Sequence, residues 1–229
     1  MTFQTSVANF ETDDGDKILY PFGPPIFQSE IDSKLTKELI EEGRKLTKEK
    51  DDWNFRLAGQ LKYGRSYHYK ENYLNKVEPY LKTYVERFFN GLHNQFDVDK
   101  ASGVDRILSV QDGRQKTRQG NVKLDSLWIN FSQKHDFNPL HSHHGILSFV
   151  IFCQVPPEIF EVQADSNTQR AGWIHFNYGD PITPLMGCEY PVRPYENLIL
   201  IFPNELKHHV PSYWVDAERI SVSGNFVVV

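Results

Sequence analysis

The sequence has little cysteine: only two cysteines occur in 229 residues. Cys153 and Cys188 are isolated from each other, and their separation matches no zinc-binding or redox pattern. A disulfide framework is therefore excluded, and we expect both to be buried, reduced thiols. Such thiols are typical of a protein from a reducing cytosol.

An excess of positive charge and long hydrophobic runs are also missing. The 25 Lys and Arg residues face 30 Asp and Glu residues, which gives a formal net charge of −5. No global field would attract nucleic acid or an anionic membrane. The apolar runs are shorter than the roughly 20 residues that span a bilayer, and Met1–Ser6 does not look like a signal peptide. We expect a cytoplasmic protein with neither membrane nor nucleic acid as a partner.

What the sequence does contain is typical of one globular unit. Hydrophobic residues make up 39% and aromatic residues 14%, which describes a packed protein rich in strand formers. No internal repeat is visible, and all-β domains of this length often stay single. We predict one domain over residues 1–229, with a helical and edge-strand part at 1–104 and a core at 105–229.

The first hundred residues predict two amphipathic helices. Ile31–Ser33 offers an N-cap to a helix whose apolar residues recur at a spacing of three to four. A second helix should run from about Asn75 to His93, with Pro79 in its first turn. Ahead of both, Pro21–Phe27 should be an extended edge segment because prolines block a central ladder position. Trp53–Leu61 has no clear period and fits a strand or a lid loop.

From about residue 105 the pattern changes to short strands separated by turns. The predicted strands are 106–110, 124–132, 146–155, 172–177, 197–202 and 219–228. Six such strands behind two amphipathic helices indicate an α+β, mainly β fold. We predict a double-stranded β-helix, the cupin-like jelly roll, buttressed by the N-terminal helices.

Two groups of histidines stand next to apolar, strand-like runs. His141 and His143 are two positions apart, so on a strand they would point to one side, whereas His144 would face away. His208 or His209 can supply a third nitrogen from a distant strand. Three such ligands occupy one triangular face of a metal and leave the opposite positions open for substrate and O₂. Imidazole suits iron, zinc, copper and nickel alike, so the ligands alone do not choose the metal.

Two other histidines enter the analysis as weaker candidates. His135 and Asp136 could form a rival ligand set, but adjacent residues on a strand point in opposite directions. His175 lies inside an apolar segment and is interpreted as a packed core residue or a substrate-pocket residue.

The last predicted strand alternates between polar and apolar residues. Arg219 and Ser221 share the polar face, and an Arg inside a barrel is costly unless its charge is compensated. A carboxylate ligand would compensate it through a bidentate hydrogen bond, with Ser221 as a further donor. The alternative is that this face looks outward to solvent. Trp128 and Asn130 similarly share the polar side of their strand, where they would line a cosubstrate pocket or an exposed face.

These motifs, taken together, resemble the 2-oxoglutarate and Fe(II)-dependent oxygenase superfamily, most of all its bacterial and phage-type members. The residues that carry the resemblance are His141-x-His143, Leu147-Ser148-Phe149 and the run Ile201-Phe202-Pro203-x₄-His208-x₁₀-Arg219-Ile220-Ser221-x₃-Asn225-Phe226. The specific part is confined to residues 128–226.

The resemblance implies a role for each matched position. His141, His143 and His208 would bind Fe(II), and His208 is preferred to His209 because its distance to Arg219 fits the pattern. Arg219 and Ser221 would hold the distal carboxylate of 2-oxoglutarate. Such enzymes use O₂ and 2-oxoglutarate, release succinate and CO₂, and hydroxylate a further substrate.

One position departs from the superfamily pattern, because most members have Asp or Glu where this chain has His143. Three neutral imidazoles leave the 2+ charge of the metal uncompensated by the protein. We therefore expect weaker retention of Fe(II), with 2-oxoglutarate supplying the balancing charge.

Two other functions are compatible with the same residues. One is a cupin-like three-His metalloenzyme that does not use 2-oxoglutarate, in which Arg219 would be structural. The other is a non-catalytic jelly-roll binding module. The sequence does not specify the primary substrate, and it leaves the oligomeric state open, a homodimer included.

Overall fold

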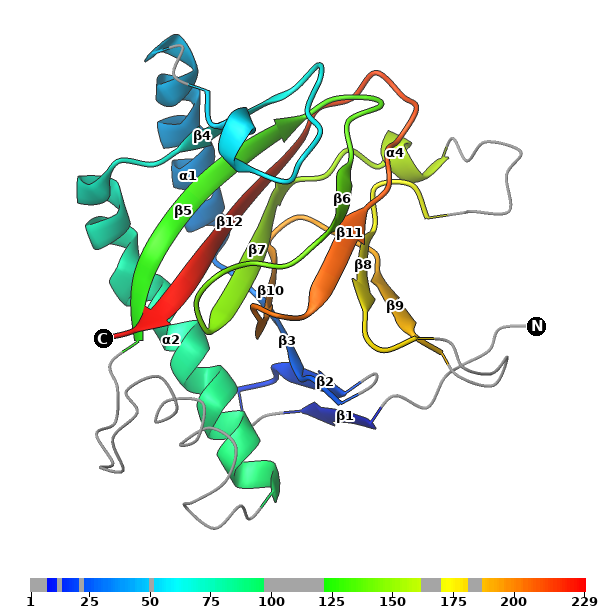
Figure 1. Cartoon of the computed structure of the whole chain (residues 1–229). Coiled ribbons are helices and arrows are strands. Elements are labelled where there is room, and N and C mark those ends of the chain that lie inside the picture. The colour runs from blue at the N-terminus through cyan, green and yellow to red at the C-terminus, as the bar shows by residue number, and fades with distance from the viewer. Residues whose placement is uncertain are drawn as a thin grey trace.

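Two antiparallel sheets form the centre of the computed structural model (Figure 1). The structure describes residues 8–11, 14–20, 23–49, 52–96, 122–161, 170–180 and 187–229. The large sheet contains, in spatial order, β1 (Ala8–Glu11), β2 (Lys17–Tyr20), β3 (Ile26–Glu30), β10 (Leu198–Pro203), β7 (Leu147–Gln154), β12 (Arg219–Val228), β5 (Val122–Ser132) and β4 (Arg65–His68). The small sheet contains β6 (Asn138–His141), β11 (Lys207–Val210), β8 (Ile174–Asn177) and β9 (Glu189–Val192).

The order of the strands is that of a jelly roll. From β5 onward the chain passes back and forth between the sheets, except that β8 and β9 follow each other in the small sheet. As a result β10, β7, β12 and β5 are neighbours in one sheet and β6, β11, β8 and β9 in the other. The fold is therefore α+β and mainly β, a double-stranded β-helix, as the sequence predicted. The N-terminal strands β3 and β4 pair with β10 and β5, which extends the large sheet on both sides.

Two long helices pack on the large sheet. Helix α1 (Ser33–Leu46) begins where the Asp32 carboxylate accepts a hydrogen bond from the Lys34 amide at 2.8 Å, which satisfies a free donor of the first turn. Helix α2 (Glu71–Phe96) starts earlier than expected, so Pro79 lies inside the helix and not in its first turn. The short helices are η1 (Thr47–Glu49), η2 (Asn54–Arg56) and α4 (Glu158–Glu161).

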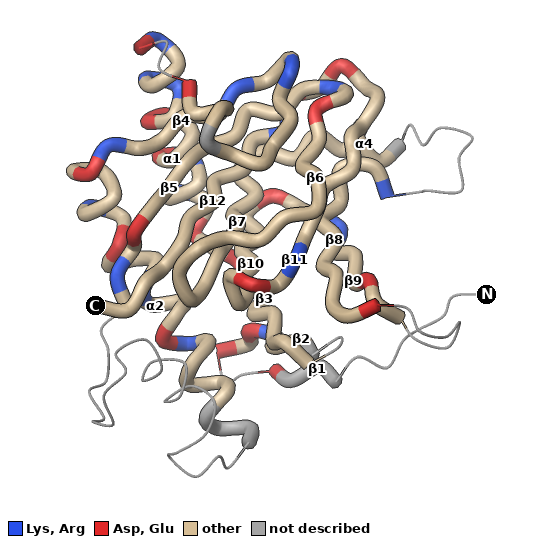
Figure 2. The backbone as a smooth tube through the Cα atoms, in the orientation of Figure 1, with Lys and Arg blue, Asp and Glu red and all other residues tan. Residues whose placement is uncertain are grey.

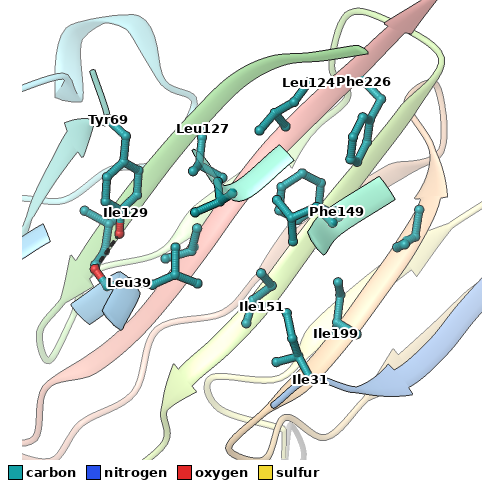
Figure 3. Close-up of a cluster of buried hydrophobic side chains, with 14 of the residues drawn as sticks. Ile31, Leu39, Tyr69, Leu124, Leu127, Ile129, Phe149, Ile151, Ile199 and Phe226 are labelled. Atoms are coloured by element: carbon teal, nitrogen blue, oxygen red, sulfur yellow. Dashed lines mark hydrogen bonds between the residues drawn. The ribbon is translucent and has the colours of Figure 1, made fainter. Parts of the chain in front are cut away.

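The large sheet is buried on both faces, and alternation along each strand decides which side chains face which layer. Ile129, Ile151 and Ile199 join the cluster packed beneath the helices, where the Tyr69 hydroxyl also donates to the Leu39 carbonyl at 2.7 Å (Figure 3). Their neighbours in sequence, such as Phe152, face the small sheet in a second apolar cluster. The space between the sheets is where polar strand residues meet.

Most strand predictions are confirmed, and the deviations have identifiable causes. Five of the six predicted strands correspond to β5, β7, β8, β10 and β12, and the sixth, 106–110, lies outside the described residues. The edge-segment prediction for Pro21–Phe27 is wrong, because β3 starts at Ile26 and pairs with both β2 and β10. Pro24 and Pro25 precede this ladder and therefore do not block it. Strands β6, β9 and β11, of four residues each, were not predicted, because their patterns are too short to recognise.

Charged residues of both signs are interspersed along the part of the chain that the structure describes (Figure 2). Among the described helices, none combines the length and apolar character that crossing a membrane requires.

Candidate active site

Three imidazoles from two neighbouring strands converge between the sheets. His141 ends β6 and lies directly opposite His208 of β11 in the ladder, while His143 follows in the turn after β6. One nitrogen from each ring lies within 4.8 Å of the others. The Nε2 atoms of His143 and His208 are 3.2 Å apart although 65 residues separate them in sequence. The small sheet therefore brings the predicted ligands together.

The sequence predicted that His143 would lie on the same strand as His141, but His143 lies in the turn after β6. Strand β6 ends at His141, and the next turn is fixed by Asn204, whose carbonyl accepts from the His143 amide at 2.9 Å and whose side chain donates back at 3.0 Å. Gly145 has a φ of 99°, and a Cβ there would approach the Phe226 carbonyl oxygen to 2.4 Å. Only glycine fits this turn without strain.

The structure also separates the neighbouring histidines. His209 points to the opposite face of the small sheet, where its ring lies against His175 at a centroid distance of 4.7 Å. His144 is exposed. Of the two candidates for the third nitrogen, His208 is thus the one that reaches His141 and His143.

Hydrogen bonds and burial prepare the rings to act as ligands. Nδ1 of His141 lies 2.7 Å from the Pro139 carbonyl oxygen, and Nδ1 of His208 lies 3.0 Å from that of Leu206. A carbonyl can only accept, so each Nδ1 donates and the lone pair is on Nε2. Burial lowers the pKa of all three imidazoles: that of His141 falls below its ordinary value, that of His143 to about 4, and that of His208 well below the ordinary value. Neighbouring imidazoles add to the shifts of His143 and His208. The rings are neutral at pH 7, as metal binding requires.

The distances fit a divalent transition metal. With metal–nitrogen bonds of about 2.1 Å, an Nε2–Nε2 distance of 3.2 Å corresponds to an angle of about 100° at the metal. This value lies between the angles of octahedral and tetrahedral coordination. Three ligands from one side leave further positions free. The donor set therefore suits a mononuclear centre that must also bind small molecules.

Arg219 lies in the same interior. It is 5% exposed, its Nη1 donates to the Gly172 carbonyl at 2.7 Å, and its Nε has no hydrogen-bond partner among the described residues. Burial lowers its pKa, although a guanidinium stays charged near neutrality. In the described part of the chain no carboxylate forms an ion pair with it. The alternative that this strand face looks to solvent is wrong, because Ser221 is also buried.

The remaining predicted residues complete the wall of one cavity. Ser221 pairs with Asn130 and Ser223 with Trp128 in the ladder between β12 and β5. The Trp128 ring lies 5.6 Å from that of His143. The cavity has a volume of about 50 Å³. All seven predicted site residues line it: Trp128, Asn130, His141, His143, His208, Arg219 and Ser221. The rest of its wall is mainly apolar and includes Leu57–Gly59, Phe152 and Phe202.

Several residues that support the cavity were not found from the sequence. The Ser66 hydroxyl of β4 donates to the Asn130 side chain at 2.6 Å. The carboxylate of Asp136 accepts hydrogen bonds from the amides of Tyr63, Gly64 and Gln133 at 2.8 to 3.0 Å. Except for the bond from Gln133, these hydrogen bonds link positions more than 60 residues apart, and no sequence pattern marks them.

The rival histidine candidates have other surroundings. Asp136 faces backbone amides, and the ring of His135 packs edge-on against Trp214 at 5.0 Å. This pair is therefore not a ligand set, which confirms its low rank. His175 is buried as expected, but it lies on the outer side of the small sheet next to Glu189 and does not line the cavity.

Comparison with known proteins agrees with the fold. Residues 126–225 match the model of the family described as "Putative 2OG-Fe(II) oxygenase". A prolyl-4-hydroxylase from Pseudomonas putida superposes with a TM-score of 0.53 at 14% identity, covering 88% of this chain and 91% of the other. A viral collagen prolyl hydroxylase from Paramecium bursaria Chlorella virus-1, solved with 2-oxoglutarate, gives 0.50 at 8% identity, covering 88% and 94%. The search of curated proteins returned no match.

Fold and family match together indicate a class of protein, the jelly-roll oxygenases. The segment similar to the 2OG-Fe(II) oxygenase family, residues 126–225, contains the three histidines and Arg219. This match supports an enzyme of the type that uses Fe(II), 2-oxoglutarate and O₂.

Proposed function

We propose that this oxygenase hydroxylates a C–H bond of its primary substrate with release of succinate and CO₂. His141, His143 and His208 hold the iron, and Arg219 and Ser221 bind the distal carboxylate of 2-oxoglutarate. The observation that carries the proposal is the buried Arg219 guanidinium, which has an unpartnered Nε and lies in the same cavity as the three imidazoles.

The three histidines fix the metal rigidly. Carbonyl acceptors at Nδ1 hold the rings of His141 and His208, and Asn204 holds the backbone of His143. Such outer contacts set both the ring orientation and its tautomer. When bound, Fe(II) supplies the redox chemistry that couples O₂ to oxidative decarboxylation of 2-oxoglutarate.

Arg219 orients the keto acid. Among the described residues no carboxylate forms an ion pair with this buried cation, which favours an anionic ligand, since a bidentate carboxylate both neutralises it and satisfies its free N–H groups. Ser221 follows on the same strand face and can donate a further hydrogen bond. The opposite end of the ligand is then directed toward the imidazoles, while Trp128 and Asn130 form the wall beside it.

Charge balance makes the keto acid a part of the metal site. The protein contributes three neutral imidazoles and one guanidinium to the cavity, so a metal ion there raises the positive charge to three. The two carboxylates of 2-oxoglutarate offset most of it, in a dry site where electrostatic interactions are stronger than in water. We therefore expect the metal and the cosubstrate to stabilise each other.

The experiment is a measurement of O₂ consumption and succinate formation with Arg219→Gln and Ser221→Ala variants, each checked for folding by circular dichroism. Truncating one partner of a buried charge pair costs about 2–5 kcal/mol, so the KM for 2-oxoglutarate should rise about 30-fold or more in Arg219→Gln. Loss of one hydroxyl donor costs about 1 kcal/mol, which predicts a rise of roughly five-fold in Ser221→Ala.

Measuring the iron content of each variant distinguishes a loss of cosubstrate binding from a collapse of the metal site. Both variants should retain one equivalent of iron, because neither residue is a ligand. Arg193→Ala serves as the control, since Arg193 is exposed and packs on Phe160. O₂ consumption that does not depend on 2-oxoglutarate, or an unchanged KM in a folded Arg219→Gln protein, would refute the proposal.

A further inference from the structure

A second histidine cluster lies on the outer face of the small sheet. Along β11 and β8 alternate residues face opposite sides, so His208 points inward and His209 outward. His209 is directly opposite His175 of β8, and Glu189 of the adjacent strand β9 contacts Nδ1 of His175. One ligand atom from each of these three residues lies within 4.8 Å of the others. We name this group, His175, Glu189 and His209, the outer cluster.

We propose that the outer cluster is a second metal site that binds a zinc-type divalent cation. Two imidazoles and one glutamate are a donor set that Zn²⁺ uses in proteins, with a water completing the tetrahedron. The three residues come from three hydrogen-bonded strands, so their spacing is set by the sheet. A rigid framework lowers the entropy cost of gathering ligands.

The polar contacts of His175 support this assignment. The residue is 3% exposed, and its only hydrogen-bond partner in the described part of the chain is Glu189, while Nε2 has none. A buried ring nitrogen without a partner costs about 1–3 kcal/mol. Packing alone would be better served here by an apolar residue. Glu189 orients the ring through Nδ1, and a cation bound in the outer cluster would replace this contact.

Access and charge favour a cation at this position. The Glu189 side chain is 44% exposed, so one side of the outer cluster is open to solvent. A neighbouring surface depression has a volume of about 640 Å³. Its lining contains three carboxylates, Asp180, Glu189 and Glu205, and one cationic side chain, Lys207. The excess of carboxylates raises the local concentration of cations.

The position of the site links it to the oxygenase centre. His209 and His208 are neighbours on β11, so a metal bound at the outer cluster would restrain the strand that carries one of the inner imidazoles. The inference itself does not depend on the proposed reaction, because the two clusters face opposite sides of the sheet.

The test is metal binding in protein whose inner cluster has been removed by His141→Ala and His143→Ala. Metal-free protein is titrated with Zn²⁺ by calorimetry, and with Co²⁺ as a spectroscopic substitute. We expect one equivalent with a dissociation constant in the micromolar range or lower and a tetrahedral Co²⁺ absorption spectrum. Glu189→Gln in the same background should weaken binding about ten-fold or more, equivalent to about 1.4 kcal/mol.

The matched control is Glu205→Gln, which removes an equal charge from the same depression but no ligand, and it should leave the constant within two-fold. The chain without substitutions should bind two equivalents of metal, and Glu189→Gln alone should bind one tightly. A single equivalent in the unsubstituted protein, binding only at millimolar zinc, or equal effects of Glu189→Gln and Glu205→Gln would each overturn the proposal.

Discussion

The Nε2 atoms of His143 and His208 lie 3.2 Å apart. Their rings are neutral and nearly parallel, with an interplanar angle of 28°. Two lone pairs at this distance would repel each other, so either a hydrogen-bonded proton or a metal ion must lie between the two nitrogens. This relationship underlies the predictions for the inner site.

The first prediction concerns the charge at position 143. His143→Asp places a carboxylate beside the metal, so Fe(II) should bind more tightly in the absence of 2-oxoglutarate. In the unsubstituted protein, 2-oxoglutarate should strengthen Fe(II) binding about ten-fold or more, because it supplies the missing negative charge, and in His143→Asp this enhancement should shrink. Anaerobic calorimetry with and without 2-oxoglutarate measures both quantities.

His144→Asp is the matched control for this experiment. It introduces the same charge at the next position, on an exposed side chain that faces away from the centre. Its Fe(II) affinity should stay close to that of the unsubstituted protein. Equal gains in the two variants would show that a general charge effect, and not ligation, is responsible.

The second prediction concerns pH. Burial holds the pKa of His143 at about 4 in the folded protein, below its ordinary value of 6.5. Between these values the unfolded chain binds more protons than the folded one, so the free energy of unfolding of the metal-free protein falls as the pH drops from 6.5 to 4. The loss attributable to His143 is about 3 kcal/mol, and it is absent above pH 6.5.

Urea unfolding of metal-free protein between pH 4 and 7 measures this slope. His143→Gln should flatten it, since the substituted side chain does not titrate. His144→Gln removes an exposed histidine that contributes only the smallest of the three causes of the His143 shift, so it should flatten the slope much less than His143→Gln. A slope that is the same in all three proteins would contradict the assignment.

The third prediction concerns Asp136, which is 2% exposed and accepts three backbone hydrogen bonds. Asp136→Ala leaves the amides of Tyr63, Gly64 and Gln133 without their acceptor. Thermal or urea unfolding should show a loss of about 2–4 kcal/mol, because hydrogen bonds to a buried charged group are strong and unmade ones are costly.

The control for this variant is Asp216→Ala. Asp216 pairs with Lys134 on the surface and its side chain is 82% exposed, so the change should cost less than about 0.5 kcal/mol. Asp136 holds the amides of Tyr63 and Gly64, which follow the cavity-wall segment Leu57–Gly59 closely in the chain. Asp136→Ala should therefore also raise the KM for 2-oxoglutarate. Stability equal to that of Asp216→Ala would refute the role of Asp136.

The fourth prediction concerns Ser66, whose hydroxyl is the hydrogen-bond donor to the Asn130 side chain at 2.6 Å. Ser66→Ala leaves the Asn130 carbonyl oxygen without this donor and frees the amide to rotate. If Asn130 lines the cosubstrate site, the KM for 2-oxoglutarate should rise about three- to ten-fold, while iron content is unchanged. Thr83→Ala, an exposed hydroxyl on α2 that bonds only within its helix, is the control.

A good part of the fold could be read from the sequence because the relevant patterns are local. The apolar stripe and the Asp32 cap define α1, and the polar alternation of residues 219–225 places Arg219 and Ser221 on one strand face. The spacing of the histidine motifs identified the candidate ligands, since several imidazoles near strand ends form a donor set that suits a transition metal. These features depend on neighbours within a few residues.

Tertiary structure decided the features that depend on distant partners. The choice of His208 over His209 follows from the register of β11 with β6, and β11 is too short for its own pattern to reveal which face is buried. The positions of Ser66, Asp136 and Asn204 beside the cavity depend on strand pairings across 60 or more residues. The outer cluster likewise exists only because three short strands pair in one order, and a sequence records residue types but not the pairing that brings them together.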